Sequence, residues 1–514
     1  MIHTAPIDLS QCEQEPIHIP GAIQSHGILL VLEESGLTVT QLSQNAADVF
    51  GIGADDILGM DVDALLKCAD KTSTLKQLLK AQNLDAINPF RLITQTKYGA
   101  LLFEAIAHRN EAGLIVELEP ATRESAVNTT EFFRSVSGTI NAMLNATDRC
   151  QLLDLVAKEV HKITEFDRVM LYEFDDDFNG TVVAEQRTGL CSYLGHKFPA
   201  SDIPKQAREL YRKNHLRLLV NVDDIVCAIL PTNNPTSGQP LDLSYSVLRA
   251  MSPIHIEYLK NMEAAASLSI SIVVKEQLVG LIACHHTEPK FVDYQIRLAC
   301  RFIAQLLSVR LLSITESALS DYKLKLKNVQ HQLMSSMALR SSLVDALTSD
   351  LSVLDLTAAS GAAVRFAGSL GTVGQVPDSK DINDLLDWLD ANCAGVLYKT
   401  QSLCQEFAAA IRYKQVASGL LAVRISTIRP DWILWFRPQK LHDVSWAGMP
   451  SKSVRLSADG LRLHPRKSFE LWKEKVEGQA HPWHQAETES ALEMRNLVLD
   501  FLISLIEGKR ATTF

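Results

Sequence analysis

The sequence predicts an α+β protein of three consecutive α/β sandwich domains joined by long helices. Its 514 residues suffice for about three domains, at roughly 100–200 residues each. Short apolar runs typical of buried strands, such as residues 27–32 and 420–428, alternate with amphipathic helical stretches. A long helix is expected from Asp293 to about residue 345, because apolar residues recur there at steps of three and four. These residues form a seam suited to a partner helix: Leu298, Phe302, Leu306, Val309 and Leu312.

Composition and charge exclude several classes of protein. The formal net charge is −10, which argues against a nucleic-acid or anionic-membrane partner. No apolar run approaches the roughly 20 residues of a membrane helix. The N-terminus lacks the basic and apolar regions of a signal peptide. The nine cysteines include no Cys-x-x-Cys pair, which favours a reducing compartment without disulfides or a zinc site. We therefore expect a soluble, cytoplasmic protein.

The first part of the chain, residues 1–125, reads as a small α+β domain behind an irregular arm. We expect strands at 27–32 and 39–42, a helix at 45–50, and a hairpin of 101–108 with 114–118. The arm carries Cys12. A thiol that must reach a ligand needs such a flexible, accessible segment, although a lone cysteine in a polar arm is more often unreactive.

The second part, residues 126–312, reads as a larger α/β domain. We expect a helix at 131–164, strands at 169–172 and 181–185, and a hairpin of 270–274 with 278–284. The acidic turn at 175–180 does not have the spacing of a calcium-binding EF-hand. The adjacent His285 and His286 face opposite ways on a strand, which argues against a zinc site.

Polar groups suited to a ligand gather in this second part. Asp202 lies between Pro199 and Pro204, whose fixed φ angles predict an irregular segment with a main-chain carbonyl free to accept. Arg217 and Arg249 provide bidentate donors for carboxylates. Serine hydroxyls at 267, 269 and 271 share one strand face. Together these groups suit a ligand with two carboxylates.

The third part, residues 313–514, reads as another α/β domain. We expect a helix at 381–407, a strand at 420–428 and a final amphipathic helix around 492–505. Between them, the segment near 461–476 fits either a strand or a helix by its apolar period. No Gly-Gly dipeptide occurs, so a diguanylate cyclase motif is absent, and no kinase ATP-binding segment follows the last helix.

Three segments carry a resemblance to a known family. Residues 199–204 read Pro-Ala-Ser-Asp-Ile-Pro and precede Gln-Ala-Arg and Leu-Tyr. Residues 12–27 read Cys-Glu-Gln-Glu-Pro-Ile-His-Ile-Pro-Gly-Ala-Ile-Gln-Ser-His-Gly, and residues 465–469 read Pro-Arg-Lys-Ser-Phe. In this order they resemble the PAS–GAF–PHY photosensory core module of bacterial phytochromes, over essentially the whole chain. The resemblance implies an arm and PAS domain (1–125), a GAF domain (126–312) and a PHY domain (313–514).

The same resemblance implies two features of topology. A figure-of-eight knot joins the PAS and GAF domains, with the loop at 231–240 as the lasso around the N-terminal arm. A tongue extends from the PHY domain at about 431–480, and a C-terminal helix leads to an output domain. The tongue residues expected to matter are Trp446, Pro465, Arg466, Ser468 and Phe469.

The resemblance further implies the cofactor biliverdin IXα, bound by a thioether between Cys12 and a vinyl group of ring A. The Asp202 carbonyl accepts from the pyrrole N–H groups, and His285 bonds the ring D carbonyl. One propionate is served by Arg217, Arg249 and Tyr211, and the other by Ser252, His255, Ser267 and Ser269. The pocket is completed by Met170, Tyr172, Phe198, Ser201, Ile203, Pro204, Ile256, Tyr258 and Met262.

We therefore expect a red/far-red photoreceptor module that has no enzymatic activity of its own. Light isomerises a bilin double bond, and the tongue exchanges sheet for helix. Arg466 reaches the Asp202 carboxylate in one state, which we assign to the far-red-absorbing state. We expect a homodimer through the long helices, with a histidine kinase, or alternatively a diguanylate cyclase, as the absent output domain. Two other functions are compatible with parts of the chain: a thiol enzyme with Cys12 as nucleophile and His18 or His26 as base, and a cyclic-nucleotide-binding GAF regulator.

Overall fold

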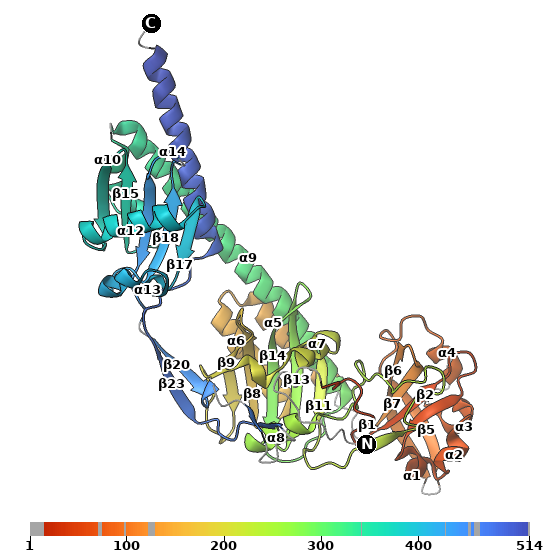
Figure 1. Ribbon diagram of the computed structural model, residues 1–514. Helices are drawn as coiled ribbons and strands as arrows, with labels where there is room; N and C mark the ends of the chain where they lie inside the picture. The colour runs from red at the N-terminus through yellow and green to blue at the C-terminus, as the bar shows by residue number, and fades with distance from the viewer. Residues whose placement is uncertain are drawn as a thin grey trace. The chain divides into compact units, whose positions relative to one another are not determined.

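The structure, a computed structural model, describes residues 15–69, 74–96, 99–121, 129–340, 342–426, 428–440, 442–450, 454–456 and 463–511 (Figure 1). The chain divides into two compact units. The first unit comprises residues 1–314 together with 445–472, and the second comprises 315–444 together with 473–514. The expected α+β class is confirmed by three main sheets, of eight, eight and five strands.

The first sheet belongs to the N-terminal domain and confirms the strands and helix expected there. Its strands run in the order β1-β12-β3-β2-β7-β6-β5-β4. The elements of this domain are β1 (Ala22–Ile23), β2 (Ile28–Leu32), β3 (Val39–Ser43), α1 (Ala46–Phe50), α2 (Ala54–Ile57), α3 (Val62–Leu65), β4 (Lys67–Cys68), α4 (Leu75–Leu79), β5 (Phe90–Thr96), β6 (Gly99–Asn110) and β7 (Gly113–Pro120). Every residue of β2 is buried because both faces of the sheet are covered.

One face of this sheet is covered by its own helices, and the other by a segment from later in the chain. We call residues 220–252 the crossing segment. Its strand β12 (Cys227–Leu230) pairs antiparallel with both β1 and β3. Leu243 N–H donates to the His18 carbonyl at 2.8 Å, and Gln24 N–H donates to the Leu248 carbonyl at 2.8 Å. The threading of the arm through a knot stays a prediction.

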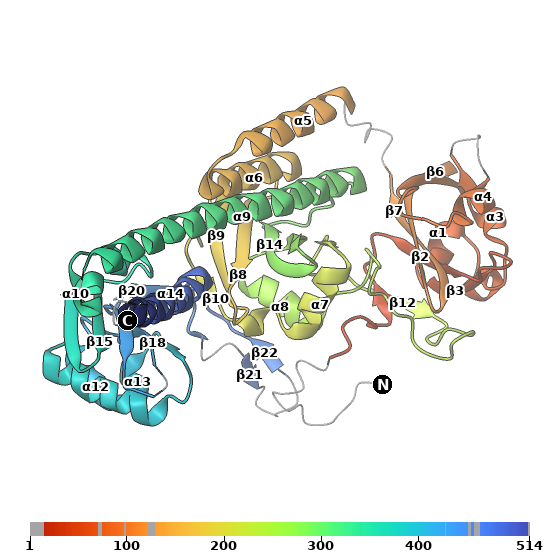
Figure 2. The ribbon, with the colours of Figure 1, turned by 90° about the horizontal axis from the view of Figure 1, so that it is seen from above.

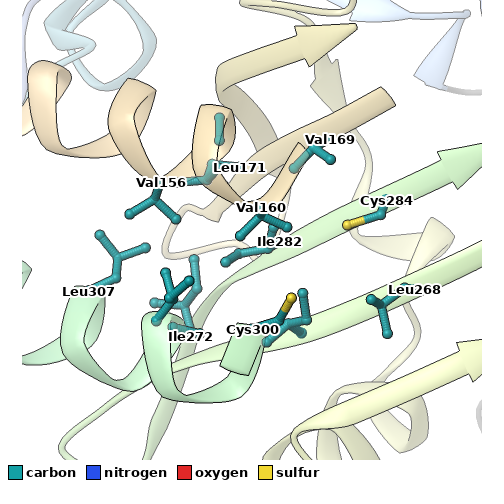
Figure 3. Close-up of a cluster of buried hydrophobic side chains, with 14 of the residues drawn as sticks. Val156, Val160, Val169, Leu171, Leu268, Ile272, Ile282, Cys284, Cys300 and Leu307 are labelled. Atoms are coloured by element: carbon teal, nitrogen blue, oxygen red, sulfur yellow. The ribbon is translucent and has the colours of Figure 1, made fainter. Parts of the chain in front are cut away.

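The second sheet forms the core of the second domain, for which the resemblance implies a GAF domain, and runs in the order β11-β13-β14-β8-β9-β10-β20-β23. Its elements and their helices are α5 (Thr129–Asn145), α6 (Arg149–Thr164), β8 (Arg168–Phe174), β9 (Gly180–Arg187), β10 (Lys197–Phe198), the 3-10 helix η2 (Ala200–Asp202), α7 (Lys205–Lys213), β11 (Leu216–Leu219), α8 (Pro253–Asn261), β13 (Ala266–Val274), β14 (Gln277–His286) and α9 (Tyr294–Leu339). Helices α5, α6 and α9 cover one face, opposite to α7 and α8 (Figure 2). Figure 3 shows side chains of α6 and α9 packed against those of β8, β13 and β14.

The single helix expected at 131–164 is wrong, since the structure breaks it into α5 and α6. The break falls at residues 146–148. The Asp148 side chain accepts the N–H of Gln151 at 2.9 Å, which is an N-cap that starts a new helix.

Helix α9 also corrects the expectation about membrane segments. It contains a stretch long and apolar enough to cross a membrane by length and composition, of which 28% is buried in the protein. One face of the helix packs into the GAF core through Cys300, Ile303, Ala304 and Leu307. A single helix of this kind is weak evidence for a membrane span.

The second unit is built on the five-stranded sheet β16-β15-β19-β18-β17. Its elements are α10 (Leu343–Thr348), α11 (Ser352–Asp355), β15 (Gly361–Phe366), β16 (Ser369–Gly374), α12 (Ser379–Asn392), β17 (Leu397–Thr400), α13 (Leu403–Glu406), the 3-10 helix η3 (Ala408–Tyr413), β18 (Gly419–Arg424), β19 (Trp432–Arg437) and α14 (Gln485–Ala511). Strand β19 is buried on both faces. Ile433 and Trp435 join the core against α9, α10 and α14, while Trp432, Leu434 and Phe436 join the core against α12 and η3.

The helix expected at 381–407 is wrong beyond residue 392. Helix α12 ends at Asn392, and the chain then forms β17, whose residues 397–400 pair antiparallel with β18. The short strand lies at the edge of the sheet. Its four residues are too few for their apolar pattern to separate a strand from a helix.

The tongue leaves the second unit after β19, so residues 432–437 of the range expected for it belong to the central sheet. Its described elements are β20 (His442–Ala447), β21 (Val454–Leu456), β22 (Leu463–Pro465) and β23 (Leu471–Val476). Strand β20 pairs parallel with β10 of the GAF sheet, with Trp446 opposite Lys197. Within the described part of the segment whose period fitted either strand or helix, residues 463–465 and 471–476 are strands.

A buried ion pair joins both ends of the tongue to the last helix. Arg437, at the end of β19, donates to Glu487 in the first turn of α14 at 2.8 Å. Arg437 also donates to the Pro482 carbonyl at 2.7 Å and to the Thr357 carbonyl. Tyr322 of α9 donates its hydroxyl to Glu487 at 2.8 Å. The side chains of Arg437 and Glu487 are 9% and 5% exposed, so loss of one charge leaves the other buried and uncompensated.

We expect Glu487→Ala to destabilise the second unit by about 3–5 kcal/mol, the usual cost of leaving one partner of a buried ion pair alone. Tryptophan fluorescence during chemical denaturation measures this, because Trp388, Trp432, Trp435 and Trp483 all lie in the second unit. Glu489→Ala is the control. Glu489 pairs with Lys323 at an exposed site, where about 1 kcal/mol or less is expected. Equal losses in the two variants would contradict the assignment.

Candidate functional site

The site is organised around the Asp202 carboxylate. Pro199 and Pro204 flank the one-turn helix η2, as their fixed φ angles predict, and Asp202 ends that turn. The side chain is 4% exposed and forms an ion pair with Arg466 of the tongue. The Tyr258 hydroxyl of α8 donates to the same carboxylate oxygen at 3.1 Å. Burial raises the pKa of Asp202 to about 6, against the opposing effect of the Arg466 guanidinium.

Arg466 reaches this position because the tongue residues around it are tightly packed. Its guanidinium donates to the Ala447 carbonyl and lies 4.7 Å from the Phe469 ring centroid. The Arg466 carbonyl accepts from the side-chain amide of Asn261 at 3.1 Å. Gly448 has φ +84°, and a Cβ there would lie 2.3 Å from the Ser468 carbonyl oxygen, so only glycine fits. These contacts place the Arg466 guanidinium of the tongue against the Asp202 carboxylate.

Apolar and aromatic side chains surround this ion pair. The Tyr258 ring meets Phe469 edge-on at 5.1 Å, and the Tyr172 ring meets Phe198 edge-on at 5.7 Å. Most of the expected pocket walls belong to this one cluster with the tongue residues Ala447 and Phe469: Met170, Tyr172, Phe198, Ile203, Tyr211, Tyr258 and Met262. The structure thus brings together residues spread over about 300 positions.

The two expected carboxylate-binding arginines lie close together but have different partners. Arg217, in β11, donates to the main-chain carbonyl of Arg249 and, at 3.5 Å, to those of Ser246 and Val247. Arg249 donates to the Ile17 carbonyl of the arm at 2.7 Å. Neither arginine has an ion pair with a carboxylate among the described residues. Burial lowers the pKa of both groups, to about 10 for Arg249.

The expected hydroxyl and imidazole groups lie next to the arginines. Tyr211 donates to Ser269 at 3.4 Å, and Ser252 caps α8 and donates to Glu15 of the arm at 3.1 Å. His255 stacks on Tyr258 with ring centroids 6.0 Å apart. His285 of β14 lies opposite Ser267 of β13. Burial lowers the pKa of His255 to about 4 and that of His285 to about 3, so both imidazoles are neutral at pH 7.

This set of groups fits an anionic ligand that also accepts and donates hydrogen bonds. Two buried guanidiniums without a carboxylate partner in the described part of the chain carry positive charge that no ion pair there compensates. Among the described residues, the buried nitrogens of this site that have no hydrogen-bond partner include Arg249 Nε, His285 Nδ1 and Arg466 Nε. Buried polar atoms are rarely left in this way, and each marks a place where a ligand atom is expected.

Some residues that were expected at the site lie outside the cluster around Asp202 or outside the described residues. Cys12 lies outside the described residues. Ser201 and Ser468 are exposed, and Pro204 precedes the first turn of α7. Ile256 packs in a separate cluster with Leu219, Val222 and Leu259. Trp446 is half-buried under the Lys197 ammonium, 5.5 Å from its ring centroid.

Sequence reasoning missed several residues of the site. Arg168 begins β8, 4% exposed, with its guanidinium 4.4 Å from the Tyr193 ring centroid and 3.4 Å from Glu185. A charged residue at the start of the apolar run Val169–Tyr172 was the available signal. Glu15 and Asn261 gave no such signal, because their partners lie more than 200 residues away.

Comparisons with known proteins agree along the whole chain. Family models described as PAS fold, GAF domain and Phytochrome region match residues 12–121, 148–311 and 326–506. The chain is 42% identical over 500 residues to cyanobacterial phytochrome B of Nostoc sp., covering 97% of this chain and 66% of that protein. It is 34% identical to a bacteriophytochrome of Pseudomonas aeruginosa, covering 96% of this chain and 67% of that protein. The chain thus spans about two thirds of the length of these curated relatives.

Solved structures show the same similarity. The phytochrome photosensory core module of Stigmatella aurantiaca aligns with a TM-score of 0.82 at 38% identity, covering 97% of this chain and 99% of that one. A bacteriophytochrome from the photosynthetic bacterium R. palustris aligns with a TM-score of 0.85 at 37% identity, covering 96% and 99%.

We expect Arg466→Ala to raise the pKa of Asp202 further, because the guanidinium is the strongest influence that lowers it. The protonated carboxyl should then persist to a pH above the wild-type midpoint of about 6. The infrared band of the protonated acid, identified by its loss in Asp202→Asn, measures the midpoint. Lys467→Ala, which removes the neighbouring exposed cation, is the control. An unchanged midpoint in Arg466→Ala would contradict the coupling.

Proposed function

This chain belongs to the phytochrome family, and we propose that it is the photosensory module of a red/far-red light receptor. The observation that carries the proposal is the buried Asp202–Arg466 pair in the same compact unit as two buried arginines, Arg217 and Arg249, that have no carboxylate partner among the described residues. We propose biliverdin IXα as chromophore, joined to Cys12 by a thioether to the ring A vinyl group. Bound biliverdin supplies red-light absorption and a double bond that isomerises.

The buried polar groups have distinct roles in this proposal. Arg249 and Tyr211 hold one propionate, and the unpartnered Arg249 Nε supports this role. Arg217 joins them only if the propionate replaces one of the carbonyls that Arg217 now contacts. The second propionate takes Ser252, His255, Ser267 and Ser269. Because His255 and His285 are neutral, they can each accept or donate one hydrogen bond without adding charge.

Asp202 connects the chromophore to the tongue. We propose that its main-chain carbonyl accepts from the pyrrole N–H groups while its carboxylate holds Arg466. His285 bonds the ring D carbonyl, and its unpartnered Nδ1 supports a ligand contact. Loss of the Asp202–Arg466 pair frees the tongue to leave its strand form.

The wider assembly follows from the same proposal. Along α9, Phe302 and Val309 are 49% and 64% exposed, which supports a homodimer through this helix. Helix α14 leads to an output domain, for which a histidine kinase is preferred over a diguanylate cyclase. The module is cytoplasmic and acts as a sensor rather than a catalyst, with PAS, GAF and PHY domains at 1–125, 126–312 and 313–514.

We expect Cys12→Ala to abolish covalent attachment while leaving much of the non-covalent binding, because the arginines and pocket walls remain. The chain is co-expressed with a haem oxygenase. Zinc-induced bilin fluorescence on a denaturing gel reports the bond, and the absorption spectrum reports binding. Cys191→Ala, which removes an exposed thiol elsewhere in the chain, should behave as wild type. A fluorescent Cys12→Ala band would assign the attachment to another residue, and a colourless wild-type protein would contradict the proposed function.

We expect Arg466→Ala to load bilin normally and to destabilise the state that holds the Asp202 pair. A hydrogen bond to a charged group contributes about 1.5–3 kcal/mol, which shifts a two-state ratio roughly 10- to 150-fold. We assign the pair to the far-red-absorbing state, so thermal reversion after red illumination should accelerate. Lys467→Ala is the control. A longer-lived far-red state would place the pair in the red-absorbing state, and unchanged kinetics would remove Arg466 from the switch.

A further inference from the structure

A carboxylate lies at the centre of the apolar contact between the PAS sheet and the crossing segment. Glu117, in β7, is fully buried. It shares its sheet face with its cross-strand neighbours Leu29 and Ile106, which pack with Leu243 and Leu248 of the crossing segment. A charged group in such surroundings is costly unless its hydrogen bonds are satisfied.

The bonds that satisfy Glu117 all come from three consecutive residues of the crossing segment. The carboxylate accepts from the Ser246 hydroxyl, from Val247 N–H at 3.0 Å and from Leu248 N–H at 2.7 Å. Two of the three donors are main-chain N–H groups, and the third is the Ser246 hydroxyl. The contact therefore fixes the backbone itself.

The same stretch is held from the opposite side by a cation. Arg217 of the GAF sheet donates to the carbonyls of Ser246, Val247 and Arg249. The N–H groups of Val247 and Leu248 thus donate to a PAS carboxylate, and the carbonyl groups of the same two peptide units, those of Ser246 and Val247, accept from a GAF guanidinium. The peptide dipoles lie between opposite charges in the orientation that both charges favour.

Arg249 follows directly after this clamped stretch. Its carbonyl accepts from Arg217, its Nη1 donates to the Ile17 carbonyl of the arm, and its Nε has no partner among the residues that the structure describes. A shift of the backbone at Val247 and Leu248 moves the guanidinium that faces the ligand site.

We propose that Glu117 is a positioning residue for the chromophore site: by clamping residues 246–248, it places Arg249 where a bilin propionate binds. The inference rests on the proposed function for the role of Arg249. It assigns to the PAS domain a direct part in chromophore uptake, through the backbone of the crossing segment.

The charge of Glu117 responds to pH in the physiological range. Burial raises its pKa to about 7, while its hydrogen bonds from Ser246, Leu248 and Val247 act in the opposite direction. The other groups that face it are His108 of β6, at 3.6 Å, and Glu119, Arg217 and Tyr294. His108 stays neutral, because burial lowers its pKa to about 4. Glu117 is therefore a full acceptor above pH 7 and loses acceptor capacity as it is protonated below that pH.

The test compares wild type with Glu117→Gln, which imitates the neutral side chain. About one unit or more above the Glu117 pKa, wild type should take up biliverdin roughly tenfold faster, the effect of losing one hydrogen bond to a charged group. Well below that pKa, the two rates should converge, because wild type has then lost the same charge. Dividing the wild-type rate by the Glu117→Gln rate at each pH cancels the effect of pH on biliverdin itself, because that effect is common to both proteins.

A second readout needs no chromophore. Amide hydrogen exchange at Val247 and Leu248 should be faster in Glu117→Gln than in wild type. Glu104→Gln is the matched control for both readouts. Glu104 is another buried carboxylate on the same sheet, and it bonds Gln295 of α9 instead of the crossing segment. If Glu117→Gln does not fold, Ser246→Ala removes one of the three donors without changing charge, and slower uptake at high pH with faster exchange at Val247 and Leu248 then carries the test.

Equal uptake by wild type and Glu117→Gln at high pH would overturn the proposal, as would a loss that is independent of pH and shared by Glu104→Gln. Unchanged exchange at residues 247 and 248 would overturn the clamp. A wild-type chain that takes up no biliverdin would overturn the proposed function and the role of Arg249, and the exchange measurement would still report the clamp separately.

Discussion

The ion pair between Asp202 and Arg466 is the interaction on which the outer part of the GAF sheet depends. Arg466 is 3% exposed, and its partners are the Asp202 carboxylate, the Ala447 carbonyl and the Phe469 ring. These contacts hold tongue residues 445–472 in the first unit, although the tongue starts and ends in the second. A buried pair of this kind adds modest stability while intact and is costly to break on one side only. It is therefore suited to a two-state element.

The residue types in the sequence predicted which chemical groups the site contains. They predicted less well which residues, far apart in the sequence, contact one another. The prolines at 199 and 204 indicated an irregular segment, and Asp202 lies there. The contact with Arg466 spans 264 residues and follows from the family motif, because no local pattern reports so distant a partner. Glu117 was missed since its partners are main-chain N–H groups 130 residues away. The break before α6 was readable from the Asp148 cap, whereas β17 was too short to separate by period from a helix.

Three buried acids connect the PAS sheet to other parts of the first unit, one to the crossing segment and two to α9. Glu117 holds the crossing segment, Glu119 holds Arg297 of α9 and His26, and Glu104 contacts Gln295. All three are at most 5% exposed. Because buried carboxylates need specific donors, they restrict the position of the PAS sheet against the neighbouring elements more strongly than apolar packing alone. The PAS domain is thereby held in place relative to the GAF site by directional bonds.

Helix α9 runs without interruption for 46 residues, from the GAF core into the core of the second unit. Its length is about 70 Å at a rise of about 1.5 Å per residue. A continuous helix transmits angle as well as position. One inserted residue near the boundary at residue 314 turns everything beyond it by about 100°, whereas an insertion of about seven residues returns nearly to the same face. The number of residues between the two cores therefore determines the rotation about the helix axis from one core to the other. We expect natural variation in the length of α9 to occur in steps of whole helical turns.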